Sequence, residues 1–139
     1  MKKILFILLL CSSISHAVEL YHAKTFKQAQ EEAIKKNKNI LLFLTSRGCY
    51  YCAQMKKRTL KEEEVIRKIN SDFIFVELDE HRKQYPSDIK VSGVPAMIFL
   101  DTKAKQVIKP VLGYWGHKNF MGHINRANQH YQTKNKDKK

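Results

Sequence analysis

Apolar residues recur three or four positions apart in three otherwise polar segments, which is the spacing of an amphipathic helix. Before the first two of these segments, Thr25 and Thr59 each stand three positions ahead of a Gln or Glu, a capping-box pattern that predicts where a helix begins. The stripes are Phe26, Ala29, Ala33 and Ile34, then Val65, Ile66 and Ile69, then Phe120, Ile124, Ala127 and Tyr131. We therefore predict three amphipathic helices, of which the first ends near Lys36.

Nearly continuous apolar runs separate these helices and predict strands. The runs 40–45 and 73–79 suit strands that are covered on both faces of a sheet. A third run follows Pro95, and residues 106–112 should pair with it as a hairpin, with Pro110 favouring an edge strand or a bulge. Because helices and strands alternate in the first part of the chain, the sequence predicts an α/β fold with parallel strands and crossover helices.

A pair of cysteines, Cys49 and Cys52, stands where the first strand leads into a further helical run. A thiol at a helix N-terminus lies near unpaired backbone N–H groups and the positive end of the helix dipole. Both favour the thiolate, which is the reactive form of cysteine. We therefore predict Cys49 as the attacking thiol and Cys52 as the resolving thiol of a redox-active pair.

Other uses of this pair have less support in the sequence. A structural zinc site needs four ligands, and the only other cysteine is Cys11, with no suitably spaced histidine pair near the dithiol. A purely structural disulfide across so short a loop would restrain the unfolded chain little. A Cu(I) metallochaperone would need Met55 or Met97 as a third soft ligand. A binding module with an incidental dithiol also stays open, and no metal or other cofactor is predicted.

The N-terminus has the pattern of a secretory signal peptide. Two lysines precede an apolar segment, 4–10, that is too short to span a bilayer comfortably. Small residues at Ser15 and Ala17 fit cleavage after Ala17, which would leave a domain of residues 18–131. Lipoprotein anchoring at Cys11 is the alternative, although the leucines before it lack the expected small residue. Either route predicts export, and we expect a periplasmic protein in a compartment with active disulfide chemistry.

The length of 139 residues allows one domain, and the formal net charge is +13. The lysines are spread along the chain and are densest in residues 132–139, which we predict to be a disordered tail. No helix carries the pattern of a nucleic-acid recognition helix. The charge therefore indicates a solvated basic surface, and nucleic acid is not a predicted partner.

The order of these elements resembles the thioredoxin fold over about residues 20–131. The resemblance rests on the dithiol after a buried strand, on Gly93-Val94-Pro95, and on a closing hairpin with Gly113 before the last helix. The run after Cys52 is more similar to exported thioredoxin-like proteins, such as the DsbD C-terminal domain and SoxW-type thioredoxins. This resemblance implies a central mixed sheet flanked by helices and a thiol–disulfide oxidoreductase. Its substrates would be protein disulfides, and a redox partner protein, either a membrane electron donor or an oxidase, would regenerate it.

The resemblance also implies a cis peptide bond between Val94 and Pro95, next to the dithiol. The backbone of Val94 would pair with a substrate segment as an added strand. A trans proline that opens an edge strand is the alternative.

The chain departs from the family at the position of a buried aspartate, where it has Phe43. In thioredoxins this carboxylate accepts the proton of the resolving thiol. Glu77, in the second strand, is a candidate substitute proton shuttle for Cys52. An ordinary solvent-exposed glutamate is the alternative.

The turn around the cysteines differs as well. Gly48 replaces the family's tryptophan, and Tyr50 and Tyr51 replace its Gly-Pro pair. The two tyrosines could contact a partner protein or simply pack. Loss of the proline leaves the direction of electron flow open. We expect reduction of protein disulfides, with disulfide oxidase or isomerase activity as the alternative.

Overall fold

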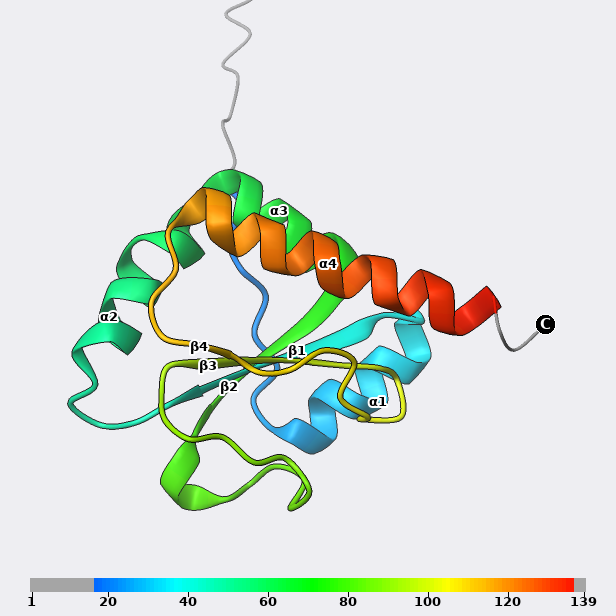
Figure 1. Ribbon diagram of the computed structural model, residues 1–139, viewed down its shortest axis with the longest axis horizontal. Coiled ribbons are helices and arrows are strands. Elements are labelled where there is room, and N and C mark those ends of the chain that lie inside the picture. Colours follow the sequence, from blue (N-terminus) through cyan, green and yellow to red (C-terminus); the bar gives the residue numbers. More distant parts are fainter. Residues whose placement is uncertain (1–16, 137–139) are drawn as a thin grey trace, which may run out of the picture.

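A four-stranded sheet with strand order β2-β1-β3-β4 organises the structure (Figure 1). The computed structural model describes residues 17–136. β1 pairs in parallel with β2 and antiparallel with β3, and β3 pairs antiparallel with β4. The bounds are β1 (Asn39–Thr45), β2 (Phe73–Asp79), β3 (Ala96–Leu100) and β4 (Val111–Leu112). The predicted mixed sheet is confirmed.

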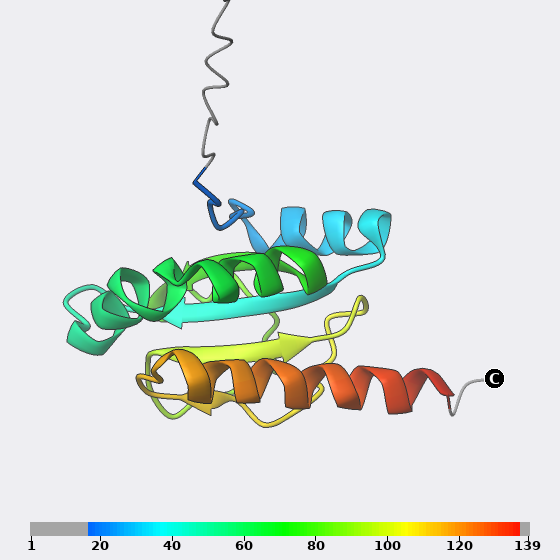
Figure 2. The ribbon, with the colours of Figure 1, turned by 90° about the horizontal axis from the view of Figure 1, so that it is seen from above.

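Helices cover both faces of this sheet (Figures 1 and 2). One long and one short helix lie on one face, a third helix lies on the other, and the helix that follows β1 lies at the end of the sheet (Figure 1). The helices are α1 (Phe26–Lys36), α2 (Tyr50–Lys57), α3 (Glu63–Asp72) and α4 (His117–Lys136), with 3₁₀ turns η1 (Thr59–Lys61) and η2 (Glu80–Arg82). In Figure 1, α3 and α4 lie above the sheet and α1 below it.

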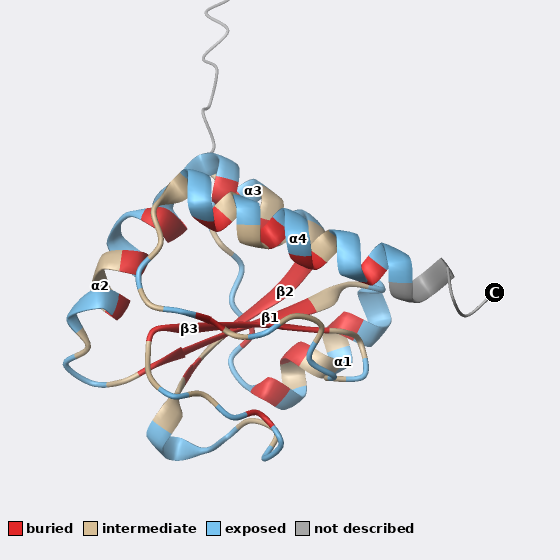
Figure 3. Cartoon of the chain, viewed as in Figure 1, coloured by how far each residue is buried: buried red, intermediate tan, exposed pale blue. Residues whose placement is uncertain are grey.

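Alternate residues of the strands supply two apolar cores, and Figure 3 shows that the central strands are largely buried. Leu41 and Phe43 belong to the core under α3 and α4, whereas Leu42 and Leu44 belong to the core on the α1 side. All four have no exposed surface, as expected for strands that lie between two helical layers. Each such side chain contributes about 1.5–3 kcal/mol through burial.

The two predicted capping boxes have different outcomes. Thr25 caps α1, because its Oγ1 accepts a hydrogen bond from the Gln28 N–H at 3.1 Å. Thr59 caps no helix: its buried hydroxyl donates to the carbonyl of Trp115 at 2.6 Å. The prediction that a helix begins at Thr59 is therefore wrong. A 3₁₀ turn occupies this position, and α3 begins at Glu63 without a side-chain cap.

The fourth strand is shorter than predicted. Within residues 106–112, only an isolated bridge between Gln106 and Leu100 and the two residues of β4 pair with β3. Pro110 lies between these pieces, and it has no N–H to donate to a continuous ladder. The hairpin nevertheless places β4 at the edge of the sheet, as Pro110 indicated.

The end of the last helix also differs from the prediction. Residues 132–136 continue α4 instead of forming a disordered tail. Glutamine and lysine are good helix formers, so a polar sequence can extend a helix whose earlier turns are anchored in the core. The remaining residues of the predicted tail, 137–139, lie outside the described residues.

The predicted signal peptide falls almost entirely on residues 1–16, which also lie outside the described residues and include Cys11. Between residues 17 and 136, no helix has both the length and the apolar character required to cross a membrane.

Candidate active site

The fold brings the cysteines and the proline loop to the same end of the sheet. Ser46 follows β1 directly, and Leu44 near the end of β1 pairs with Ala96 at the start of β3. The segment that ends in Pro95 therefore lies beside the loop that carries Cys49. The Gly113 N–H donates to the carbonyl of Pro95 at 2.8 Å and holds this loop against the end of β4. The peptide bond between Val94 and Pro95 is cis, in agreement with the implication of the resemblance.

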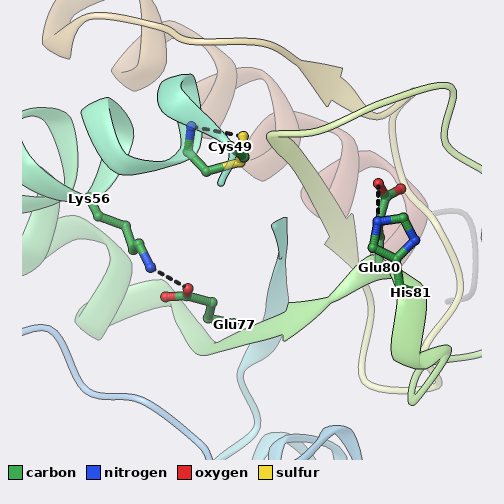
Figure 4. Close-up of a disulfide and its surroundings, with 6 residues drawn as sticks. Cys49, Lys56, Glu77, Glu80 and His81 are labelled. Atoms are coloured by element: carbon green, nitrogen blue, oxygen red, sulfur yellow. Dashed lines mark hydrogen bonds and ion pairs between the residues drawn. A yellow bond between two sulfur atoms is a disulfide. The ribbon is translucent and has the colours of Figure 1, made fainter. Parts of the chain in front are cut away.

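The two cysteines form a disulfide, with an S–S distance of 2.04 Å. Cys49 is the N-cap residue of α2, and its Sγ accepts a hydrogen bond from the Cys52 N–H at 3.1 Å (Figure 4). Cys52 is only 2% exposed, whereas Cys49 is partly exposed. The sulfur that a partner can reach is therefore also the sulfur at the positive end of a helix.

The residue before Cys49 has a conformation that favours glycine. Gly48 has φ of +74°, in the left-handed region. A tryptophan in this conformation would be strained.

A phenylalanine occupies the inner side of the dithiol. Phe43 and Met55 are fully buried in the same core as Cys52. Glu77 pairs with Phe43 on the neighbouring strand, so its side chain points to the same face of the sheet. Its Oε1 accepts a hydrogen bond from Lys56 Nζ at 2.7 Å, and Figure 4 shows the carboxylate directed toward that lysine. The Glu77 side chain is 24% exposed. This exposure lies between the two alternatives for Glu77, a buried proton shuttle and an ordinary solvent-exposed glutamate.

This ion pair limits the influence of Lys56 on Cys49. The positive charge of Lys56 is compensated by Glu77, so it adds less potential at the dithiol than an unpaired lysine would. His22 packs edge-on against Phe75, with ring centroids 4.8 Å apart. Partial burial lowers the pKa of His22, and Lys56 lowers it further, whereas Glu77 opposes both. His22 comes from an extended segment with no periodic pattern, so its position near the site could not be predicted from the sequence.

Tyr50 and Tyr51 lie on the surface between the cysteines. Their exposed fractions are 66% and 59%, and their rings meet edge to face at a centroid distance of 5.3 Å. Neither side chain is packed in the core. An exposed aromatic pair beside a reactive sulfur is suited to contact with a partner protein.

The methionines offer little to a metal at the dithiol. Met55 and Met97 are buried, and the Met55 sulfur accepts a hydrogen bond from the Trp115 N–H at 3.3 Å. In residues 17–136, no three His, Cys, Asp or Glu side chains are grouped as metal ligands.

The solved structures of several redox proteins are similar to this fold. DsbH oxidoreductase matches with a TM-score of 0.64 and 21% identity, over 85% of this chain and 91% of that chain. The oxidised DsbD C-terminal domain of Neisseria meningitidis has a TM-score of 0.61 and 20% identity, over 78% and 99%. The periplasmic thioredoxin SoxS of Paracoccus pantotrophus has a TM-score of 0.56 and 17% identity, over 68% and 99%.

The sequence comparisons are more restricted. Among curated proteins, no relative matches the chain. The family model of the thioredoxin-like domain matches residues 26–128, which is most of the chain and contains both cysteines and Pro95. The chain therefore belongs to the thioredoxin-like domain family, and its Cys49–Cys52 disulfide makes it a thiol–disulfide oxidoreductase.

Proposed function

We propose that this protein reduces disulfides of other proteins in the periplasm, with Cys49 as the attacking thiol and Cys52 as the resolving thiol. The observation that carries this assignment is the difference between the two sulfurs. Cys49 is partly exposed at the N-terminus of α2, and Cys52 is buried beneath it. Only the first can reach a disulfide on another protein.

The reaction would proceed in two exchange steps that conserve electrons. The Cys49 thiolate attacks one sulfur of the substrate disulfide, a mixed disulfide forms, and the other substrate sulfur leaves as a thiolate. The Cys52 thiol loses its proton and attacks Cys49 Sγ, which releases the first substrate sulfur. The substrate then holds two thiols and the protein holds the Cys49–Cys52 disulfide. A dithiol electron donor must reduce this disulfide before the next cycle.

The surrounding residues have proposed roles in the same cycle. The backbone of Val94, beside Pro95, would pair with the substrate segment, and Tyr50 and Tyr51 would contact the substrate surface. Glu77 would accept the proton of Cys52. The pairing of Glu77 with Phe43 in the sheet register supports this role, because it places the carboxylate on the same face as Phe43, which shares a core with Cys52.

Serine variants of the two cysteines test the assignment. Cys49→Ser should abolish reduction of a protein disulfide such as that of insulin. Cys52→Ser should still attack but should accumulate a mixed disulfide that is visible by mass spectrometry. If Cys52→Ser and not Cys49→Ser lost the attack, the roles would be reversed. If both variants kept full activity, the dithiol would not be the redox site.

The direction of electron flow is measured by the reduction potential in glutathione buffers, read by mass after thiol trapping. A value near the thioredoxin end, about −270 mV, supports a reductase, and one near the DsbA end, about −120 mV, would assign an oxidant. The likeness to a periplasmic thioredoxin and the sequence pattern of residues 1–17 support a periplasmic location. The intact mass of the exported protein should correspond to a chain that begins at Val18.

A further inference from the structure

A groove lies beside the Val94–Pro95 loop, on the side away from α3 and α4. Its volume is about 460 Å³. Its lining comes from the segment just before the loop and from the edge of the sheet at β4. The lining residues are Lys90, Val91, Ser92, Lys109, Pro110 and Leu112.

The groove exists because no helix covers this part of the sheet. Leu112 pairs with Ala96, whose side chain belongs to the core on the α1 side, so Leu112 points to that same face. α1 packs against β1 and β2, and Figure 2 shows it at the opposite side of the molecule from β4. As a result Leu112 is 40% exposed, although it lies in a strand. The outer edge of β4 is open as well, because β4 ends the sheet.

The rim of the groove is positively charged. Lys90 and Lys109 are exposed, and neither pairs with a carboxylate among the residues that the structure describes. The ion pair closest in sequence, between Lys105 and Asp88 at 3.4 Å, uses other residues. Two uncompensated lysines at the sides of an apolar floor are complementary to a chain segment that carries both acidic and apolar side chains.

We propose that this groove binds an extended, acidic and partly apolar segment of the protein whose disulfide is exchanged. The proposal rests on the proposed function and adds the chemistry of the substrate. An extended segment fits because the groove borders β4, the end strand of the sheet, whose outer edge can accept an added strand. Ser92 in its lining stands two positions before Val94, so a segment held in the groove would lie next to the loop that lies beside Cys49. Lys90 and Lys109 would select acidic partners by attraction and disfavour basic ones by repulsion.

Two peptide probes and two double variants test the groove. Both peptides contain one cysteine in a mixed disulfide with a chromogenic thiol, and they differ only in carrying Glu-Leu-Glu or Lys-Leu-Lys next to the cysteine. The reduced protein releases the chromogenic thiol, and the second-order rate constant is measured at low salt. The test variant is Lys90→Glu with Lys109→Glu. The matched control is Lys24→Glu with Lys35→Glu, which changes the net charge equally at exposed positions on and beside α1.

The acidic peptide should react at least ~10-fold more slowly with the test variant, and less than ~2-fold more slowly with the control variant. The lysine peptide should react faster with the test variant, and the differences should shrink at ~0.5 M salt because exposed charges are then screened. A small disulfide without a peptide should react equally with all three proteins. Equal slowing by both variants would assign the effect to net charge and overturn the groove.

The groove and the proposed function can fail separately. If the unaltered protein reduces the small disulfide but does not distinguish the two peptides, the groove has no role in selection and the dithiol chemistry stands. If the unaltered protein reduces no probe while Cys49 is free, the proposed function itself is overturned, and the groove loses its assigned substrate.

Discussion

The environment of single residues decides the chemistry of this site. Both residues of the pair are cysteines, yet their surroundings differ. Cys49 caps a helix at the surface, whereas Cys52 lies in a core with Phe43 and Met55. The motif and its place after a strand were sufficient to predict that Cys49 stands at the start of a helix, but they did not predict the burial of Cys52. The partner of Glu77 was not predictable, because Lys56 is far from it along the chain and meets it only through the packing of α2 on the sheet.

Replacing Glu77 by glutamine tests whether it is a proton acceptor or only the partner of Lys56. Without the carboxylate, Cys52 must lose its proton to solvent, so the resolving step should slow by about 10- to 100-fold near pH 7. The rate should then rise with pH toward the ordinary pKa of a thiol, about 8.5. Attack by Cys49 on a small disulfide should not change. Rapid-quench measurement of the mixed disulfide separates the two steps.

Glu80→Gln is the matched control, because this residue follows β2 directly and its carboxylate lies 3.7 Å from the ring of His81 (Figure 4). It should leave both steps unchanged. An unchanged resolving rate and pH profile in Glu77→Gln would show that the ion pair with Lys56 is only structural.

At the scale of elements, periodicity predicted which segments are helices and strands. The capping pattern failed at one position, where a tertiary contact competes with the local signal. The capping pattern occurs twice in the sequence, at Thr25 and at Thr59. Only Thr25 uses its hydroxyl on its own helix, because Thr59 is only 1% exposed and bonds to a carbonyl from another part of the chain. A side chain that is buried satisfies the nearest buried polar group first, and no local pattern reveals that group.

Asparagine substitutions should distinguish the capping role of Thr25 from the buried role of Thr59. Asparagine is a good N-cap, so Thr25→Asn should change the free energy of unfolding by less than ~0.5 kcal/mol, whereas Thr25→Ala should cost ~1 kcal/mol. Thr59→Asn should cost ~2 kcal/mol or more, because a larger polar side chain enters a packed site. Urea denaturation measures all three. Tolerance of asparagine at both positions would mean that Thr59 also acts as a cap.

At the scale of the molecule, the alternation of elements was sufficient to predict the parallel pair β1 and β2. The mixed sheet followed only from the resemblance to the thioredoxin fold. The alternation did not reveal the groove beside β4, because an uncovered surface depends on how far α1 reaches across the sheet. It also gave no sign of the contacts that join distant elements. Asp72, at the end of α3, accepts a hydrogen bond from Asn128 of α4 at 2.6 Å. Within α3, Asp72 also forms an ion pair with Lys68 at 2.8 Å.

Because of these contacts, the free energy of unfolding should depend on pH in the acid range. Burial pushes the pKa of Asp72 upward, but hydrogen bonds from Lys68, Ser71 and Asn128 outweigh it and hold this pKa below its usual value. In the N-terminal half, hydrogen bonds from Lys36 and Tyr21 lower the pKa of Glu32 to about 2. A carboxyl with a lowered folded-state pKa stabilises the fold above its unfolded pKa, near 4. That stability is lost as the pH falls through the folded-state value.

Asp72→Asn should therefore lower the free energy of unfolding by about 1 kcal/mol at pH 7, a figure that allows for the partial exposure of this side chain. The difference from the unaltered protein should shrink as the pH falls below about 4, because Asp72 then takes up its proton and both proteins lack the charge at this position. Asp88→Asn is the control: its side chain is 61% exposed and its ion pair with Lys105 is long, so stability should change by less than ~0.5 kcal/mol. Urea titrations between pH 2 and pH 7 measure both. A difference for Asp72→Asn that stays constant down to pH 2 would mean that its contact with α4 stabilises through packing and not through charge.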